Sequence, residues 1–233
     1  MKFGSITTGI VSDGLVFNMD AANRASYVPD ATLSYNTTNL SISGSLINDT
    51  SYIAPPTSAS CWSFDGVDDY INVGNDSSIM IGTGDFTISG WMKIDGTNSG
   101  INGLIGKYGT ISTGHTDYLF GITGMKLVIF VGRGGGWAAY KVGATTLSSN
   151  TWYYIACTLD RDGDATLYLN DSSDGTVAMS DPSVDISSSN TYAMGQGDGN
   201  YFDGKIGLVQ LYNRSLSASD ILHNYNALKG RFT

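Results

Sequence analysis

The chain has 233 residues, and all 21 of its acidic residues are aspartate, so any mechanism that needs a glutamate general base or nucleophile is excluded. Its 30 glycines, together with abundant Ser, Thr and Asn, favour strands and turns over helix interiors. The formal net charge is −9, and the 12 basic residues are scattered along the chain, which excludes the basic surface that binds nucleic acid or an anionic membrane.

Segments with alternating apolar residues, separated by turn residues, recur along most of the chain and predict β-strands. The expected strands are 15–20, 61–65, 69–73, 85–94, 103–108, 117–122, 125–131, 137–142, 151–160, 165–170, 192–195 and 204–212. The stretch 35–56 is rich in Ser, Thr and Asn, so we expect a loop there with at most one edge strand. Short strands without long helices between them predict an antiparallel two-sheet sandwich.

The clearest local signals are a hairpin and a C-terminal helix. The strands 151–160 and 165–170 flank Asp162-Gly163, a pair that favours the positive φ of a tight turn. Ser217 and Asp220 have the spacing of a capping box, and apolar residues follow at positions 221, 222, 225 and 228. We therefore expect a helix over about 217–229 that packs on the sandwich.

The two cysteines are expected to be free thiols. Large apolar residues alternate with Cys61 in its strand, whereas Cys157 shares the apolar face of its own strand. The opposite phases argue against a bond between them and predict that Cys157 is buried. A disulfide between the two remains the alternative.

The N-terminal residues lack the apolar run of a signal peptide, and no stretch approaches the 18 apolar residues of a membrane helix. We expect a chain that is neither exported by the Sec pathway nor inserted in a membrane. Residues 1–12 carry few charges and contain Phe3, Ile6, Ile10 and Val11, so they are a candidate leader or docking arm. The remainder, 13–233, is expected to be a single domain.

Several segments stand out for their order along the chain. They are GLVFNMDAAN at 14–23, WSFDGVDDYI at 62–71, DFTISGW at 85–91, TWYYIA at 151–156, FDGKI at 202–206 and LYNRSLS at 211–217. Together they resemble the laminin-G-like, concanavalin A-like lectin/glucanase superfamily. The resemblance implies an all-β jelly roll of two antiparallel sheets.

Within that superfamily, the opening segment is similar to proteins of tailed bacteriophages. This resemblance implies a virion component, either a capsid decoration or a tail-associated protein, that is assembled in the host cytoplasm. Its implied partners are other virion proteins, host-surface glycans as adhesion ligands, and further copies of the same chain. A free-standing carbohydrate-binding lectin is the alternative, followed by a polysaccharide hydrolase. Because related glucanases use two glutamates, and this chain has none, we expect a non-catalytic protein.

The candidate glycan-binding residues lie in two glycine-rich segments, because sugar recognition needs an aromatic platform and planar hydrogen-bonding groups at a loop rim. The first segment carries Arg133, Trp137 and Tyr140, and the second carries Asp198, Asn200 and Tyr201. The alternative for each segment is a flexible turn with a packed aromatic side chain.

The resemblance also implies a calcium site on the outer side of the sandwich, formed by the N-terminal strand and a carboxylate of the final strand. Relatives often read Gly-Lys-Ile-Asp in that strand, whereas this chain reads Gly204-Lys205-Ile206-Gly207. The expected carboxylate is missing, so Asp20 and Asp203 remain as candidate calcium ligands. No other cofactor is expected.

Overall fold

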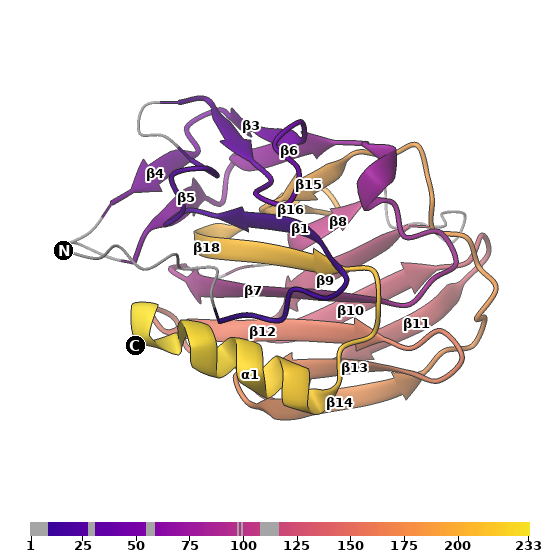
Figure 1. Cartoon of the computed structure of the whole chain (residues 1–233). Helices are drawn as coiled ribbons and strands as arrows, with labels where there is room; N and C mark the ends of the chain where they lie inside the picture. The colour runs from indigo at the N-terminus through magenta and orange to yellow at the C-terminus, as the bar shows by residue number, and fades with distance from the viewer. Residues whose placement is uncertain (1–8, 28–30, 55–58, 97, 99, 108–116) are drawn as a thin grey trace.

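Alternating apolar residues build a sandwich of two antiparallel sheets (Figure 1). The structure is a computed structural model that describes residues 9–27, 31–54, 59–96, 98, 100–107 and 117–233. Within these residues, each sheet has eight strands, and β16 (Gln196–Gly197) and β17 (Asn200–Tyr201) form a separate hairpin. The predicted all-β jelly-roll sandwich with a short C-terminal helix is confirmed.

The first sheet has the strand order β14-β13-β12-β7-β18-β5-β4, and β1 pairs with β18 beside this path. Its strands are β1 (Leu15–Asp20), β4 (Ser51–Ile53), β5 (Cys61–Asp65), β7 (Phe86–Ile94), β12 (Trp152–Leu159), β13 (Asp164–Leu169), β14 (Ser172–Ala178) and β18 (Asp203–Tyr212). The predicted hairpin around Asp162-Gly163 is the β12–β13 pair.

The second sheet has the order β11-β10-β9-β8-β15-β6-β3-β2. Its strands are β2 (Leu33–Tyr35), β3 (Ser43–Ile47), β6 (Tyr70–Gly74), β8 (Ile101–Lys107), β9 (Tyr118–Thr123), β10 (Lys126–Gly132), β11 (Trp137–Val142) and β15 (Tyr192–Met194). A short 3₁₀ helix, η1 (Ser77–Ile79), follows β6.

Six strands in the described residues were not predicted: β2, β3, β4, β14, β16 and β17. The stretch 35–56 was predicted as a loop with at most one edge strand, but β3 pairs with β6 and β4 pairs with β5, while β2 pairs with β3. The strand β14 pairs with β13 where no strand was predicted. These strands are short or interrupted by Ser and Gly, so they contain too few apolar residues to form a clear period-2 pattern, and pairing with a neighbouring strand orders them.

The strand β12 shows how one strand serves two apolar layers. Ile155, Cys157 and Leu159 face the core between the sheets, whereas Tyr154 and Ala156 face the opposite side. That opposite side of the first sheet is covered by the helix α1 (Ala218–Leu228), so the strand is buried on both faces (Figure 1).

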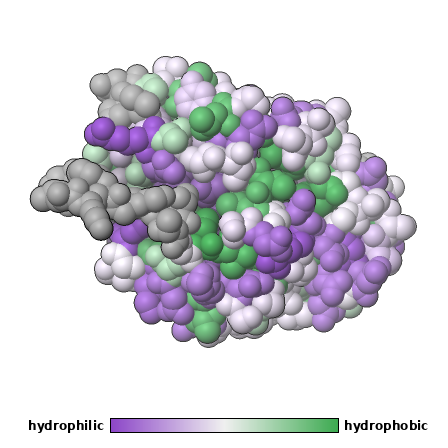
Figure 2. Space-filling view, viewed as in Figure 1, coloured by the Kyte–Doolittle hydropathy of each residue, from purple (hydrophilic) through white to green (hydrophobic). Residues whose placement is uncertain are grey.

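The helix α1 begins and packs as predicted, with one exception. Ser217 caps it in a reciprocal capping box with Asp220. Ile221 and Leu228 are buried against the first sheet, but Leu222 is 42% exposed and therefore lies outside the packed face. Hydrophilic side chains surround the hydrophobic ones on this side of the molecule (Figure 2). No helix in the described part of the chain has the length and apolarity of a membrane span.

Both cysteines are free and buried, as the strand phases predict for Cys157. In the first sheet, β18 and β7 lie between β5, which carries Cys61, and β12, which carries Cys157. Three strand spacings amount to about 14 Å, which is too far for a disulfide. Cys61 is also buried, which its phase did not indicate.

Candidate functional site

A polar cavity of about 240 Å³ opens at the rim of the sandwich, where the ends of β5, β7, β17 and β18 meet. The residues that line it are Asp65, Gly66, Val67, Asn98, Gly199, Asn200, Tyr201 and Asp203. We call this the rim cavity. Two Phe-Asp-Gly tripeptides meet beside it, because Asp203 pairs with Asp65 and Gly204 pairs with Phe64 across β18 and β5, and Asp65, Gly66 and Asp203 of these tripeptides line the cavity.

Asp203 is held in the rim cavity by its backbone and by neighbouring glycines. Its backbone N–H donates to Asn98 Oδ1 at 2.8 Å, and Asn98 Nδ2 donates to the Asp203 carbonyl at 3.1 Å. A Cβ atom on Gly66 or Gly96 would overlap with the Asp203 side chain. Both glycines therefore leave the space that this carboxylate occupies.

The carboxylate of Asp203 lies in a negative environment. Burial, together with the charges of Asp95 and Asp65, raises the pKa of Asp203, and nearby Lys205 partly offsets this. Asp95 itself is paired with Lys205 and with Lys93, the latter at 3.2 Å. Asp95 thus has two cationic partners and does not line the cavity, whereas Asp203 and Asp65 are the acidic groups that do.

More aspartates extend the negative charge along the turn that follows β5. One carboxylate oxygen from each of Asp65, Asp68 and Asp69 lies within 4.8 Å of the others. Asp69 is 2% exposed, and burial together with the charge of Asp65 raises its pKa. Asp68 and Asp69 therefore add negative charge beside Asp65, which lines the rim cavity.

The opposite wall of the rim cavity is an amide and an aromatic ring from β17. Asn200 Nδ2 donates to the Asp198 carbonyl at 2.9 Å, and Gly100 leaves room for the Asn200 side chain. Tyr201 is half-buried, and its ring lies 6.2 Å from that of Tyr70, measured between centroids. Carboxylates, an amide and the Tyr201 side chain thus line one open space, which suits a ligand with several hydroxyl groups.

The other predicted glycan-binding segment lies elsewhere, on the outer face of the second sheet. The ring of Phe130 packs 5.3 Å from Trp137 and 4.9 Å from Tyr140, again between centroids. Trp137 is half-buried, Tyr140 is 47% exposed, and Arg133 is exposed at the β10–β11 turn. We call Phe130, Trp137 and Tyr140 the outer-face aromatic group.

The two predicted segments therefore do not form one site. The rim cavity lies near the start of β8, where Ile101 pairs with Thr123, and Thr123 also pairs with Lys126 at the start of β10. Arg133 follows the other end of β10, so it lies at the opposite end of these strands. The structure brings Asn200, Tyr201 and Asp203 together in the rim cavity. Asp198 lies in the same hairpin but does not line the cavity.

Comparison with known proteins identifies the family. Residues 65–222 match the family model of the concanavalin A-like lectin/glucanases superfamily, which is more than half of the chain. The chain belongs to this superfamily. No curated protein matches the chain by sequence.

Several solved structures have a similar fold at low sequence identity. The binding domain of Paraclostridial Mosquitocidal Protein 1 has a TM-score of 0.70 at 16% identity, covering 96% of this chain and 53% of the other. A botulinum neurotoxin type C structure has a TM-score of 0.65 at 12% identity, covering 92% and 51%. Domain 4 of the arabinanase AbnA from Geobacillus stearothermophilus has a TM-score of 0.66 at 13% identity, covering 91% and 98%. The chain thus spans about half the length of the toxin chains, and the likeness shows the fold.

The two candidate calcium ligands of this superfamily member do not meet. Asp20 pairs with Leu208, which is five positions along β18 from Asp203, or about 17 Å. Asp20 also binds Arg231 through both of its carboxylate oxygens. The predicted pairing of Asp20 with Asp203 as ligands of one ion is therefore wrong.

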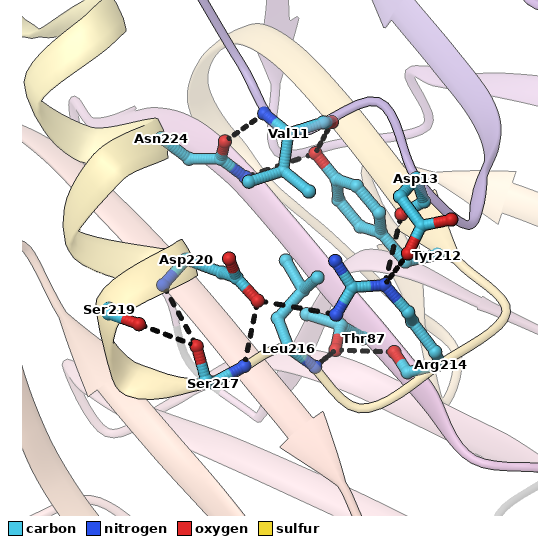
Figure 3. Close-up of polar contacts among 10 residues, drawn as sticks. All are labelled: Val11, Asp13, Thr87, Tyr212, Arg214, Leu216, Ser217, Ser219, Asp220 and Asn224. Carbon is cyan, nitrogen blue, oxygen red and sulfur yellow. Dashed lines mark hydrogen bonds and ion pairs between the residues drawn. The ribbon is translucent and has the colours of Figure 1, made fainter.

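Part of the predicted docking arm packs against other residues of the same chain (Figure 3). The Val11 N–H donates to Asn224 Oδ1 at 2.8 Å, and the Tyr212 hydroxyl donates to the Val11 carbonyl at 3.1 Å. Ile10 and Val11 are half-buried against the residues under α1, so this part of the predicted arm packs on its own chain. Phe3 and Ile6 lie outside the described residues.

Asp65 and Asn98 were missed as members of the site. The signal for Asp65 was present, because Phe-Asp-Gly occurs at both 64–66 and 202–204, and the two copies pair in the structure. Asn98 has no comparable signal, since it is placed by a loop and its hydrogen bonds reach 105 residues along the chain.

Proposed function

We propose that the chain is a non-catalytic binding module that recognises a glycan through the rim cavity. The observation that carries this proposal is the convergence of Asp65, Asp203 and Asn200 on an open polar cavity next to the ring of Tyr201. Carboxylate and amide groups can accept and donate hydrogen bonds to neighbouring sugar hydroxyls, and an aromatic side chain can cover the apolar face of a sugar ring.

The charge of the rim cavity selects the class of glycan. Asp65 and Asp203 line it, and Asp68 and Asp69 lie beside Asp65. A sialylated or uronic-acid glycan would bring a further negative charge into this environment, which is unfavourable. We therefore expect neutral or amino sugars to bind. The structure of AbnA domain 4, a fold neighbour, is a complex with the neutral sugar arabinotriose, which supports the use of this fold for such ligands.

The binding test compares variants of the rim cavity with a matched variant outside it. Glycan-array hits are titrated by calorimetry with the wild type, Asn200→Ala and Asp203→Asn. Loss of one hydrogen bond to a charged or amide group is expected to weaken binding about 10-fold or more. Tyr140→Ala removes an exposed aromatic residue of the outer-face aromatic group and is expected to leave the affinity unchanged.

Three outcomes contradict the proposal. A blank array argues against glycan binding altogether. Binding that is lost in Tyr140→Ala and Trp137→Ala but kept in the cavity variants places the site on the outer face of the second sheet. Turnover of a β-glucan or an exopolysaccharide that Asp203→Asn abolishes would show a hydrolase instead of a binding module.

The biological setting that we propose is a phage particle. The similarity of the segment 14–23 to proteins of tailed bacteriophages motivates a virion component that docks to other virion proteins and offers the rim cavity to host-surface glycans. Mass spectrometry of purified particles from a producing phage should detect the chain at a stoichiometry set by the particle symmetry. Particles that lack the chain would refute the virion role without affecting the test of glycan binding.

A further inference from the structure

The resemblance to the superfamily implies a calcium ion between the N-terminal strand and the final strand, and two residues decide whether that ion fits here. Asp20 ends β1, and the next residue, Ala21, donates its N–H to the Gly207 carbonyl at 3.0 Å. Position 207 therefore lies beside Asp20, but glycine offers no side-chain ligand. A Cβ atom on Gly207 would overlap with the ring of Phe232, so this space is filled by the chain itself.

Asp20 is already paired with a cation from the C-terminal end of the chain. Arg231 Nη1 donates to Oδ2 at 2.9 Å, and Nη2 donates to Oδ1 at 2.6 Å. The Ala22 N–H also donates to Oδ1, at 2.9 Å. The Asp20 side chain is only 6% exposed. Calcium needs six to eight oxygen ligands. Within the residues that the structure describes, position 207 offers no side-chain ligand, and both oxygens of Asp20 already accept hydrogen bonds from Arg231 and Ala22, so these residues do not fit the ion.

The C-terminal residues hold the guanidinium in place by packing. Arg231 ends η2 (Lys229–Arg231), which directly follows α1. The next residue, Phe232, stacks on the buried Trp91 with centroids 4.6 Å apart and an angle of 10° between the rings. It also packs 4.8 Å from Trp152. The Arg231 guanidinium carbon lies 5.0 Å from the Phe232 ring, so the ring anchors the turn that presents Arg231 to Asp20.

We propose that Arg231 takes the place of the metal ion in this chain. Its planar guanidinium matches the carboxylate of Asp20 with two parallel hydrogen bonds and supplies a positive charge from the C-terminal turn. The contact ties the end of β1, and through it β18, to the turn that follows α1. The fold at this position is then independent of divalent cations and dependent on the last turn of the chain.

Thermal unfolding of the full chain tests this proposal. The wild type and Asp20→Asn are expected to show the same response to EDTA and to millimolar calcium chloride, because no ion sits at Asp20. Arg231→Met leaves a buried carboxylate without its cation and is expected to lower the melting temperature by about 10 °C. Asp20→Asn is expected to lower it less, because the Arg231 side chain is more exposed, at 19%, and can be hydrated.

Two further variants separate the ion pair from general damage to the C-terminal turn. Lys229→Met removes an exposed cation of the same turn that binds Asn226, and it is expected to change the melting temperature by less than about 2 °C. Arg231→Lys keeps the charge but loses the paired geometry, so its melting temperature should lie between those of the wild type and Arg231→Met. Arg231→Met with an unchanged melting temperature would overturn the proposal. So would an EDTA-induced loss of stability in the wild type that Asp20→Asn removes.

Discussion

At the scale of single residues, Asp203 shows how a carboxylate that lines a cavity can reduce stability. Burial and the nearby charges of Asp95 and Asp65 raise its pKa, so the folded protein holds this proton more tightly than the unfolded chain does. Stability from such a group rises as the pH falls through the folded-state pKa, and the ionised carboxylate is unfavourable at neutral pH. The same charge is what the proposed glycan site uses to bind hydroxyl groups.

Asp203→Asn is therefore expected to melt at a higher temperature than the wild type at pH 7, since the isosteric amide removes an unfavourable charge. The difference should shrink as the pH is lowered through the raised pKa, where the wild-type carboxyl becomes neutral as well. Circular dichroism melts between pH 7 and pH 4 measure it.

Asp76→Asn is the control of opposite sign. Hydrogen bonds from Ser78 lower the pKa of Asp76, so its ionised form stabilises the fold above the unfolded-state pKa, and this gain is lost as the pH falls through the lowered pKa. This variant should lose stability at pH 7 and approach the wild type in acid. An Asp203→Asn difference that is independent of pH would contradict the electrostatic account.

At the scale of elements, local sequence signals were sufficient to predict the helix and insufficient to predict the short strands β3 and β4. The start of α1 depends on Ser217 and Asp220, which are three residues apart, so its capping box could be predicted from the sequence. The strands β3 and β4 depend on β6 and β5, which follow them in the chain, and with five and three residues they are too short to show a clear apolar period. Pairing with another strand orders these segments, and this pairing cannot be predicted from the residues of the segments alone.

Ser217→Ala is expected to destabilise the protein by about 1 kcal/mol, because it removes the side chain that accepts the Asp220 N–H at 3.2 Å. For a domain of this size, that corresponds to a melting temperature lower by about 2–4 °C. Ser219→Ala, in the first turn of the same helix, is the matched control and should have a smaller effect, since its hydroxyl contacts Ser217 at an exposed position. Equal losses in the two variants would show that the cap does not stabilise α1.

At the scale of the whole molecule, composition and alternation were enough to predict the sandwich, whereas the rim cavity needed the three-dimensional pairing. Four separate segments supply its lining: the turn at 65–67, Asn98, the hairpin residues 199–201 and Asp203. The sequence showed Asn200, Tyr201 and Asp203 as separate candidates, and the register of β5 with β18 brings Asp65 to them. Asp65 and Asp203 are 138 positions apart in the sequence, so their pairing is a property of the folded sheet.

The buried thiols give a test of the fold as a unit. Burial raises the pKa of Cys157 and keeps it in the unreactive thiol form, and Cys61 is equally buried. Labelling of both cysteines is therefore expected to proceed at the rate of global unfolding, and a reducing agent should leave the melting temperature unchanged. Rapid labelling of either cysteine under native conditions would show that part of the first sheet opens without global unfolding.

The four tryptophans divide among the three apolar layers of the molecule. Trp62 lies between the sheets, Trp91 and Trp152 lie under α1 and the C-terminal turn, and Trp137 lies on the outer face of the second sheet. Variants that keep one tryptophan at a time would give each layer its own fluorescence signal. Emission from Trp91 would report whether the C-terminal turn detaches before the sandwich melts, and quenching of Trp137 by solutes would follow the surface far from the rim cavity.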